Sequence, residues 1–165
     1  MQFLTERQPW RWTVEFDVAP QFDDSLRLIE IWRAAKRDGL PRRQDISTRV
    51  LGPFLKNIFT VAFDAKAGDY VYTTIGSAIV SAFGVEAFRV PVGSVFADAR
   101  DADGARTLYK YVLRRRRPMV AAGHVQGSGG AWATFEAVHL PLRDPAHGGM
   151  ILGGLFFVDA IDDGQ

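Results

Sequence analysis

The chain has 165 residues, a length at which a single domain buries about two-thirds of its unfolded surface. Its formal net charge of +1 provides no overall field that would attract nucleic acid or anionic lipid. The absence of cysteine excludes disulfides, thiolate metal sites and cysteine nucleophiles. The N-terminus lacks the basic start and apolar stretch of a signal peptide, and we therefore expect a cytoplasmic protein without membrane association.

The first third of the chain contains an arm and two helical segments. Apolar and polar side chains alternate in residues 1–20, which is typical of an extended arm or a short strand. Apolar residues then recur at three- and four-residue steps from Phe22 to Arg37, which predicts an amphipathic helix. A short helical segment with Asp45 as its cap is expected to follow, ending near Leu55.

The remainder of the chain is expected to form a sheet interrupted by helices. Alternating patterns bounded by turn residues predict strands at 57–64, 69–75, 119–126, 131–142 and 150–158. Three- and four-residue spacing predicts helices at 77–83 and 101–117. The expected fold is α+β, a five-stranded antiparallel sheet with helices on one face and an extra N-terminal helix. The domain is expected to span residues 21–160.

A series of short motifs resembles one known family. The motifs are Ile31-Trp32-Arg33, residues 40–46 and 51–64, Tyr72-Thr73-Thr74-Ile75-Gly76-Ser77, Pro118, residues 136–142 and Gly153-Gly154. In this order, over residues 26–158, they are similar to a bacterial, mainly alphaproteobacterial, family of stand-alone PAS domains, PAS_5. The resemblance implies a non-catalytic sensory or interaction domain that signals through a partner protein or as a homodimer.

The resemblance also implies where a ligand would bind, since PAS ligands lie between the sheet and the helices that close it. We expect a small apolar ligand there, and the alternative is that the same side chains only fill a core. The candidate pocket residues are Phe59, Val61, Tyr72, Ile75, Val80, Phe83, Phe96, Tyr109, Val112, His124, Phe135, Glu136 and Phe157.

The polar members of this set have alternative explanations. A carboxylate in the middle of a strand needs a partner if it is buried, so Glu136 is expected either to contact a ligand or to pair with an arginine. His124 lies on a predicted strand and is expected either to face the pocket or to lie at the surface. The three histidines are too far apart in sequence for a typical metal site, and we expect no metal.

No cofactor is expected. Flavin photochemistry in PAS-like domains requires a cysteine, and the sequence contains none. Haem-binding PAS domains commonly supply an axial histidine from the long helix before the third strand, whereas residues 101–117 contain no histidine. The arginines at 114–117 close that helix, where their charges offset its dipole, so we expect no nucleic-acid binding.

Self-association is expected through the helix from Phe22 to Arg37, because its apolar stripe needs a covering surface. Leu26, Ile29 and Trp32 are the candidate dimerisation residues. Two alternative functions remain open. One is a dimerisation module with a filled core, and the other is an enzyme on a curved-sheet cone, similar to ketosteroid isomerases, with Asp64 or Glu136 as its base.

Overall fold

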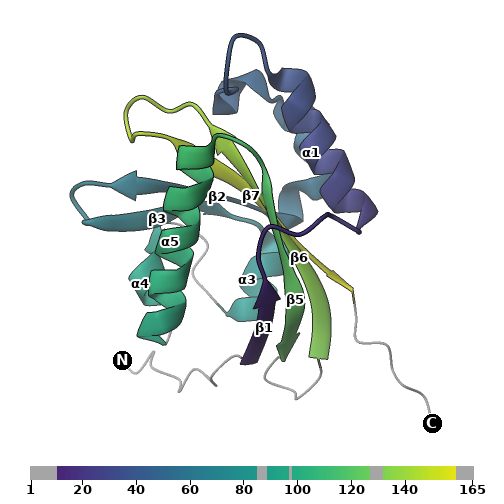
Figure 1. Ribbon diagram of the computed structural model, residues 1–165, viewed down its shortest axis with the longest axis vertical. Helices are drawn as coiled ribbons and strands as arrows, with labels where there is room; N and C mark the ends of the chain where they lie inside the picture. Colours follow the sequence, from purple (N-terminus) through teal and green to yellow (C-terminus); the bar gives the residue numbers. More distant parts are fainter. Residues whose placement is uncertain (1–10, 85–88, 97, 127–131, 159–165) are drawn as a thin grey trace.

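The computed structural model describes residues 11–84, 89–96, 98–126 and 132–158. Within these residues, seven strands form one antiparallel sheet in the order β1-β5-β6-β7-β2-β3-β4 (Figure 1). The strands are β1 (Arg11–Glu15), β2 (Ile58–Asp64), β3 (Asp69–Ile75), β4 (Val90–Pro91), β5 (Met119–Gln126), β6 (Trp132–Leu142) and β7 (Met150–Val158). The five expected strands are thus present, and β1 and β4 extend the sheet at its two edges.

Helices cover both faces of the sheet. They are α1 (Asp23–Ala35), α2 (Thr48–Leu51), α3 (Ser77–Phe83), α4 (Val92–Val95) and α5 (Ala99–Arg115), with 3-10 turns η1 (Arg43–Asp45) and η2 (Gly52–Asn57). We call the face covered by α3, α4 and α5 the inner face, and the face covered by α1, α2 and η2 the outer face. The extra N-terminal helix therefore lies opposite the helices that follow β3.

The strand β1 is part of the N-terminal arm and joins the sheet at the edge next to β5. It pairs with β5 from Arg11 opposite Gln126 to Glu15 opposite Ala122 (Figure 1). The two strands come very close, since a Cβ atom added at Gly123 would lie 1.7 Å from the Thr13 carbonyl oxygen. A glycine at this position of β5 is what allows β1 to approach.

The helix α1 is an integral part of the outer core, which corrects the expectation that its apolar stripe lacks a surface within the domain. Ile29 and Trp32 are 6% and 2% exposed, and the Trp32 indole N–H donates to the Pro141 carbonyl at 2.8 Å. The physical reason is that alternate residues of β6, among them Leu140, present a second apolar row that α1 covers. Ile29 and Trp32 are unavailable to a partner, and only Leu26 is exposed.

The glycine pair in β7 allows side chains to pack closely on both faces. A Cβ atom at Gly153 would lie 2.0 Å from the Phe59 ring on the inner face. At Gly154 it would lie 2.5 Å from a methyl group of Leu28, which belongs to α1 on the outer face. The two glycines therefore bring Phe59 and α1 into direct contact with the backbone of the central strand.

The capping residue of the short helical segment differs from the expected one. The Ser47 hydroxyl accepts the Val50 N–H at 3.1 Å and caps α2. Asp45 instead accepts the Arg42 N–H at 2.8 Å within η1. The segment divides into η1, α2 and η2. Asp45 therefore belongs to η1, whereas Ser47 caps the separate helix α2.

Candidate functional site

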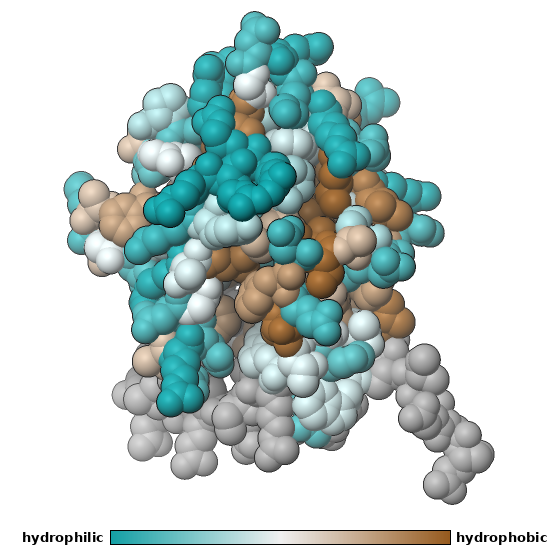
Figure 2. Space-filling view, viewed as in Figure 1, coloured by the Kyte–Doolittle hydropathy of each residue, from teal (hydrophilic) through white to brown (hydrophobic). Residues whose placement is uncertain are grey.

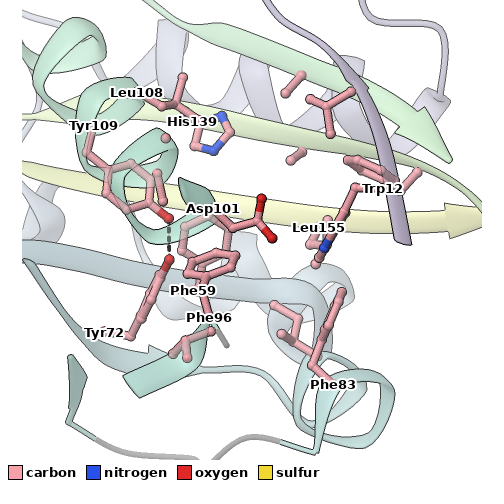
Figure 3. A pocket seen from close by; sticks show the side chains of 18 of the residues that line it. Trp12, Phe59, Tyr72, Phe83, Phe96, Asp101, Leu108, Tyr109, His139 and Leu155 are labelled. Atoms are coloured by element: carbon pink, nitrogen blue, oxygen red, sulfur yellow. Dashed lines mark hydrogen bonds between the residues drawn. The ribbon is translucent and has the colours of Figure 1, made fainter. Parts of the chain in front are cut away.

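A cavity of about 500 Å³ lies on the inner face of the sheet and opens partly to solvent. The sheet forms its base, and α3, α5 and the segment before α5 form its sides (Figure 3). Most of its lining is apolar, and the phenylalanines in it are Phe16, Phe59, Phe83, Phe96 and Phe135. Rigid aromatic rings around an open volume are typical of small-molecule sites.

Two tyrosines provide a polar region in this lining. The hydroxyls of Tyr72 on β3 and Tyr109 on α5 form a hydrogen bond, drawn as a dashed line in Figure 3. Burial raises the pKa of both hydroxyls, so both are protonated at neutral pH. Since one hydroxyl donates to the other, the pair retains one O–H that can donate to a third group.

His139 on β6 lies beside the tyrosine pair. Its ring is 3% exposed, and its centroid is 6.0 Å from that of Tyr109. Burial lowers the pKa of His139 to about 4, so the ring is neutral at neutral pH. Its Nδ1 lies 3.3 Å from the Met119 carbonyl oxygen, which favours a proton on Nδ1 and leaves Nε2 as an acceptor.

The strand β1 supplies one wall of the cavity through Trp12, Val14 and Phe16. The Trp12 ring stacks on Phe83 of α3 at 5.5 Å and 7°, and meets Phe135 edge-on at 5.5 Å and 86°. Figure 2 shows apolar surface over β1 and between β1 and α5. Val14 on β1 and Phe16 just after it are 37% and 56% exposed. The described part of the arm thus contains a short strand that builds part of the site.

A comparison with protein families decides what this architecture is. The model of PAS_5, a PAS domain, matches residues 22–157. The chain belongs to the PAS_5 family of PAS domains. A comparison with curated proteins found no match. The matched range contains the sheet from β2 to β7 and the helices of both faces, whereas β1 lies before it.

More than half of the expected pocket residues line the cavity of this PAS domain. They are Phe59, Tyr72, Ile75, Phe83, Phe96, Tyr109 and Phe135. Val61 and Val112 are buried in the inner core without lining the cavity. Val80 on α3 and Phe157 on β7 also lie outside the lining, although the Phe157 ring is 5.9 Å from that of Phe83.

Glu136 is buried but lies on the outer face, which corrects its expected place in the pocket. Its neighbours Phe135 and Ala137 line the cavity, so strand alternation directs the carboxylate to the other side. There Oε2 accepts the Gln21 N–H at 2.7 Å and Oε1 accepts the Phe22 N–H at 3.0 Å. Phe22 is the N-cap residue of α1, so the partner of this carboxylate is a helix N-terminus and not an arginine.

His124 also lies away from the cavity. Its ring is exposed, and Nδ1 is 3.2 Å from the Thr134 hydroxyl on the neighbouring strand β6. Thr134 precedes the cavity-lining Phe135, so alternation places this contact on the outer face. Of the two histidines on neighbouring strands, His139 reaches the cavity and His124 does not.

The lining residues that the sequence patterns missed include the β1 side chains, His139 and the first turn of α5. The only available signal for β1 was its alternation, which does not reveal the strand it pairs with. Alternation along β6 places His139 on the same face as Phe135 and Ala137. The sequence does not say whether this face or the opposite face of β6 borders the cavity.

Charged residues stand at the mouth of the cavity on the first turn of α5, namely Asp98, Arg100 and Asp101. Asp98 caps the helix, accepting the Arg100 N–H at 2.8 Å. Partial burial, and secondly the charge of Asp98, raise the pKa of Asp101. In Figure 3 the Asp101 carboxylate points into the space between Phe96 and Trp12.

Among the described residues, no group of three or more metal-binding side chains is close enough together to hold an ion. None of the described helices combines the length and apolar character needed to cross a membrane.

Proposed function

We propose that this PAS domain is a non-catalytic sensor that binds a small, largely apolar ligand in the cavity of its inner face. The cavity itself is the observation that supports the proposal. Its volume of about 500 Å³ lies within the range of ligand pockets, about 300–1,000 Å³, and its lining is mainly aromatic and aliphatic.

The competing function is a dimerisation module with a filled core. A core at native packing density contains few voids larger than a water molecule. The inner face instead contains an open cavity beside Phe59 and Phe135. On the outer face, α1 packs directly against the sheet. The ligand-binding function therefore has the better structural support.

The isomerase alternative loses both of its candidate bases. Glu136 accepts two backbone N–H groups on the outer face. Asp64 is the last residue of β2, where it accepts the Lys66 N–H at 2.8 Å and pairs with Arg89 at 3.0 Å. Neither carboxylate lines the cavity, so neither can act as a base on a molecule bound there.

We further propose that occupancy of the cavity is passed to a partner protein or to a second copy of the domain. The strand β1 is the element best placed for this role. It forms a wall of the cavity through Trp12, and it lies at one edge of the sheet. A ligand that contacts Trp12 would change the stability of the pairing between β1 and β5.

The test is a thermal-shift screen of small apolar compounds against two matched variants. Ala105 lines the cavity from α5, so Ala105→Phe should fill it with little loss of stability and abolish the shifts seen with wild type. Thr107→Phe on the exposed side of α5 is the control and should keep them. A filled core would give no shifts in wild type and a loss of about 1–3 kcal/mol in Ala105→Phe.

A further inference from the structure

We propose that the ligand of this cavity is a small uncharged aromatic molecule with a hydroxyl group, which hydrogen-bonds to Tyr72, Tyr109 and His139. The inference rests on the proposed function, because it names the chemical class of ligand for the same cavity. The cavity could bind apolar molecules of other classes, so the two proposals can fail separately.

The three polar side chains form what we call the polar floor of the cavity. Tyr72, Tyr109 and His139 are 7%, 4% and 3% exposed, and all three line the cavity. They come from β3, α5 and β6, so the fold brings together residues from three separate elements. Figure 3 shows His139 above the hydrogen-bonded tyrosine pair, on the same side of the cavity.

The hydrogen-bonding capacity of the polar floor exceeds what its members use among themselves. The tyrosine pair has one O–H left to donate, and His139 with its proton on Nδ1 has Nε2 left to accept. A hydroxyl group both donates and accepts, so a single ligand hydroxyl can satisfy the tyrosine pair and the histidine together.

The charges around the cavity favour an uncharged ligand over an anion. The polar floor is neutral, because burial keeps His139 unprotonated and both tyrosines protonated. At the mouth, Asp98 and Asp101 against Arg100 leave one net negative charge. A carboxylate ligand would therefore meet no buried cation among the described lining residues and would pass two acidic side chains on entry.

The walls favour a flat ring as the body of the ligand. Trp12, Phe59 and Phe96 face the same space as the Tyr109 ring (Figure 3). Aromatic rings gain from stacked and edge-on contacts beyond the burial of their area. A hydroxylated ring would place its apolar body against these walls and its polar group on the floor.

The experiment is isothermal titration calorimetry with three probes of similar size: para-ethylphenol, para-ethylfluorobenzene and para-ethylbenzoate. We expect wild type to bind the phenol about tenfold more tightly than the fluoro compound, which corresponds to one well-placed buried hydrogen bond. The benzoate should bind most weakly of the three, because its charge finds no partner in the cavity.

The decisive variant is the double substitution Tyr72→Phe with Tyr109→Phe. Replacing both partners of a buried hydrogen bond with apolar groups of the same shape is nearly neutral for stability, so the variant should fold. It should bind the fluoro compound as wild type does and lose the preference for the phenol. Tyr70→Phe is the matched control, because Tyr70 is buried in the same core and lies outside the cavity lining.

Four results would overturn the inference. Equal affinity of wild type for the phenol and the fluoro compound, or a phenol preference that survives the double substitution, would show that the tyrosine hydroxyls do not select the ligand. Tightest binding of the benzoate would show that the charge argument is wrong. If no probe binds, the hydroxyl class is rejected, and the thermal-shift screen decides the proposed function independently.

Discussion

His139 is the residue whose ionisation should affect stability most clearly. Its pKa falls from the ordinary 6.5 to about 4 on burial, so the unfolded chain binds a proton that the folded chain excludes between these pH values. The free energy of unfolding is therefore unaffected by His139 above about pH 6.5. It falls by up to about 3 kcal/mol as the pH falls from there toward 4. Urea unfolding across this pH range should show that loss in wild type.

The variant His139→Gln should flatten this dependence, because glutamine has no proton to gain. His147→Gln is the control, since His147 is exposed and pairs with Asp144 at 2.8 Å. Wild type and His139→Gln have the same carboxylates, so the difference between these two curves isolates His139. Parallel curves for wild type and His139→Gln would contradict the burial of a neutral ring.

Glu136 should be essential for the junction between the sheet and α1. Glu136→Gln retains the shape but replaces one acceptor oxygen with an N–H₂ group, which would face the N–H of Gln21 or Phe22. We expect a loss of about 1–3 kcal/mol in the free energy of unfolding. Glu30→Gln on the exposed side of α1 should change it by less than about 0.5 kcal/mol. Similar losses in the two variants would exclude the capping role.

At the scale of elements, β1 should detach from the sheet without disturbing its neighbours. Gly123→Val places side-chain atoms where the Thr13 carbonyl lies, since even the Cβ atom would come within 1.7 Å of that oxygen. We expect hydrogen exchange at β1 to become fast while β6 and β7 remain protected. The detached strand should also take Trp12 away from the cavity and weaken ligand binding.

The adjacent substitution Ala122→Val provides the control for β1. Ala122 lies on the same strand and pairs with Glu15, but it already has a Cβ atom. It should therefore leave exchange at β1 slow. Unchanged exchange in Gly123→Val would mean that β1 adapts to the added side chain, and the proposed wall of the cavity would not depend on this glycine.

At the scale of the whole molecule, two cores share one sheet, and we expect them to unfold together. Trp32→Ala removes a large side chain from the outer core and should cost about 3–5 kcal/mol. Near- and far-ultraviolet circular dichroism should still give one coincident transition. Leu26→Ala, at a 45% exposed position of the same helix, should cost less than about 0.5 kcal/mol.

The variants Trp32→Ala and Leu26→Ala also test the hypothesis that α1 mediates self-association. If Trp32→Ala left stability unchanged and converted dimers to monomers in light scattering, α1 would be an interface instead of core. Homodimerisation of the domain itself stays a prediction, and any interface would have to use surface other than Ile29 and Trp32.

The elements of this fold could be predicted from the sequence because their signals are local. The predicted ranges 69–75, 119–126 and 150–158 coincide with β3, β5 and β7, and the range 77–83 coincides with α3. Alternation, helical spacing and turn residues act over a few positions, so they identify a strand or a helix without knowledge of its neighbours. The family motifs, found over residues 26–158, predicted how these elements assemble, and the PAS_5 model matches residues 22–157.

The site could not be predicted from the sequence alone, because local periodicity does not say which helices cover which face of a strand. Shifting a strand by one position exchanges Phe135 with Glu136, and only the placement of α1 and α5 on opposite faces decides between them. The pairing of β1 with β5 joins residues more than 100 positions apart, which no local pattern encodes. The cavity is the space that these packed elements leave open, so its existence was decided by how their side chains meet in three dimensions.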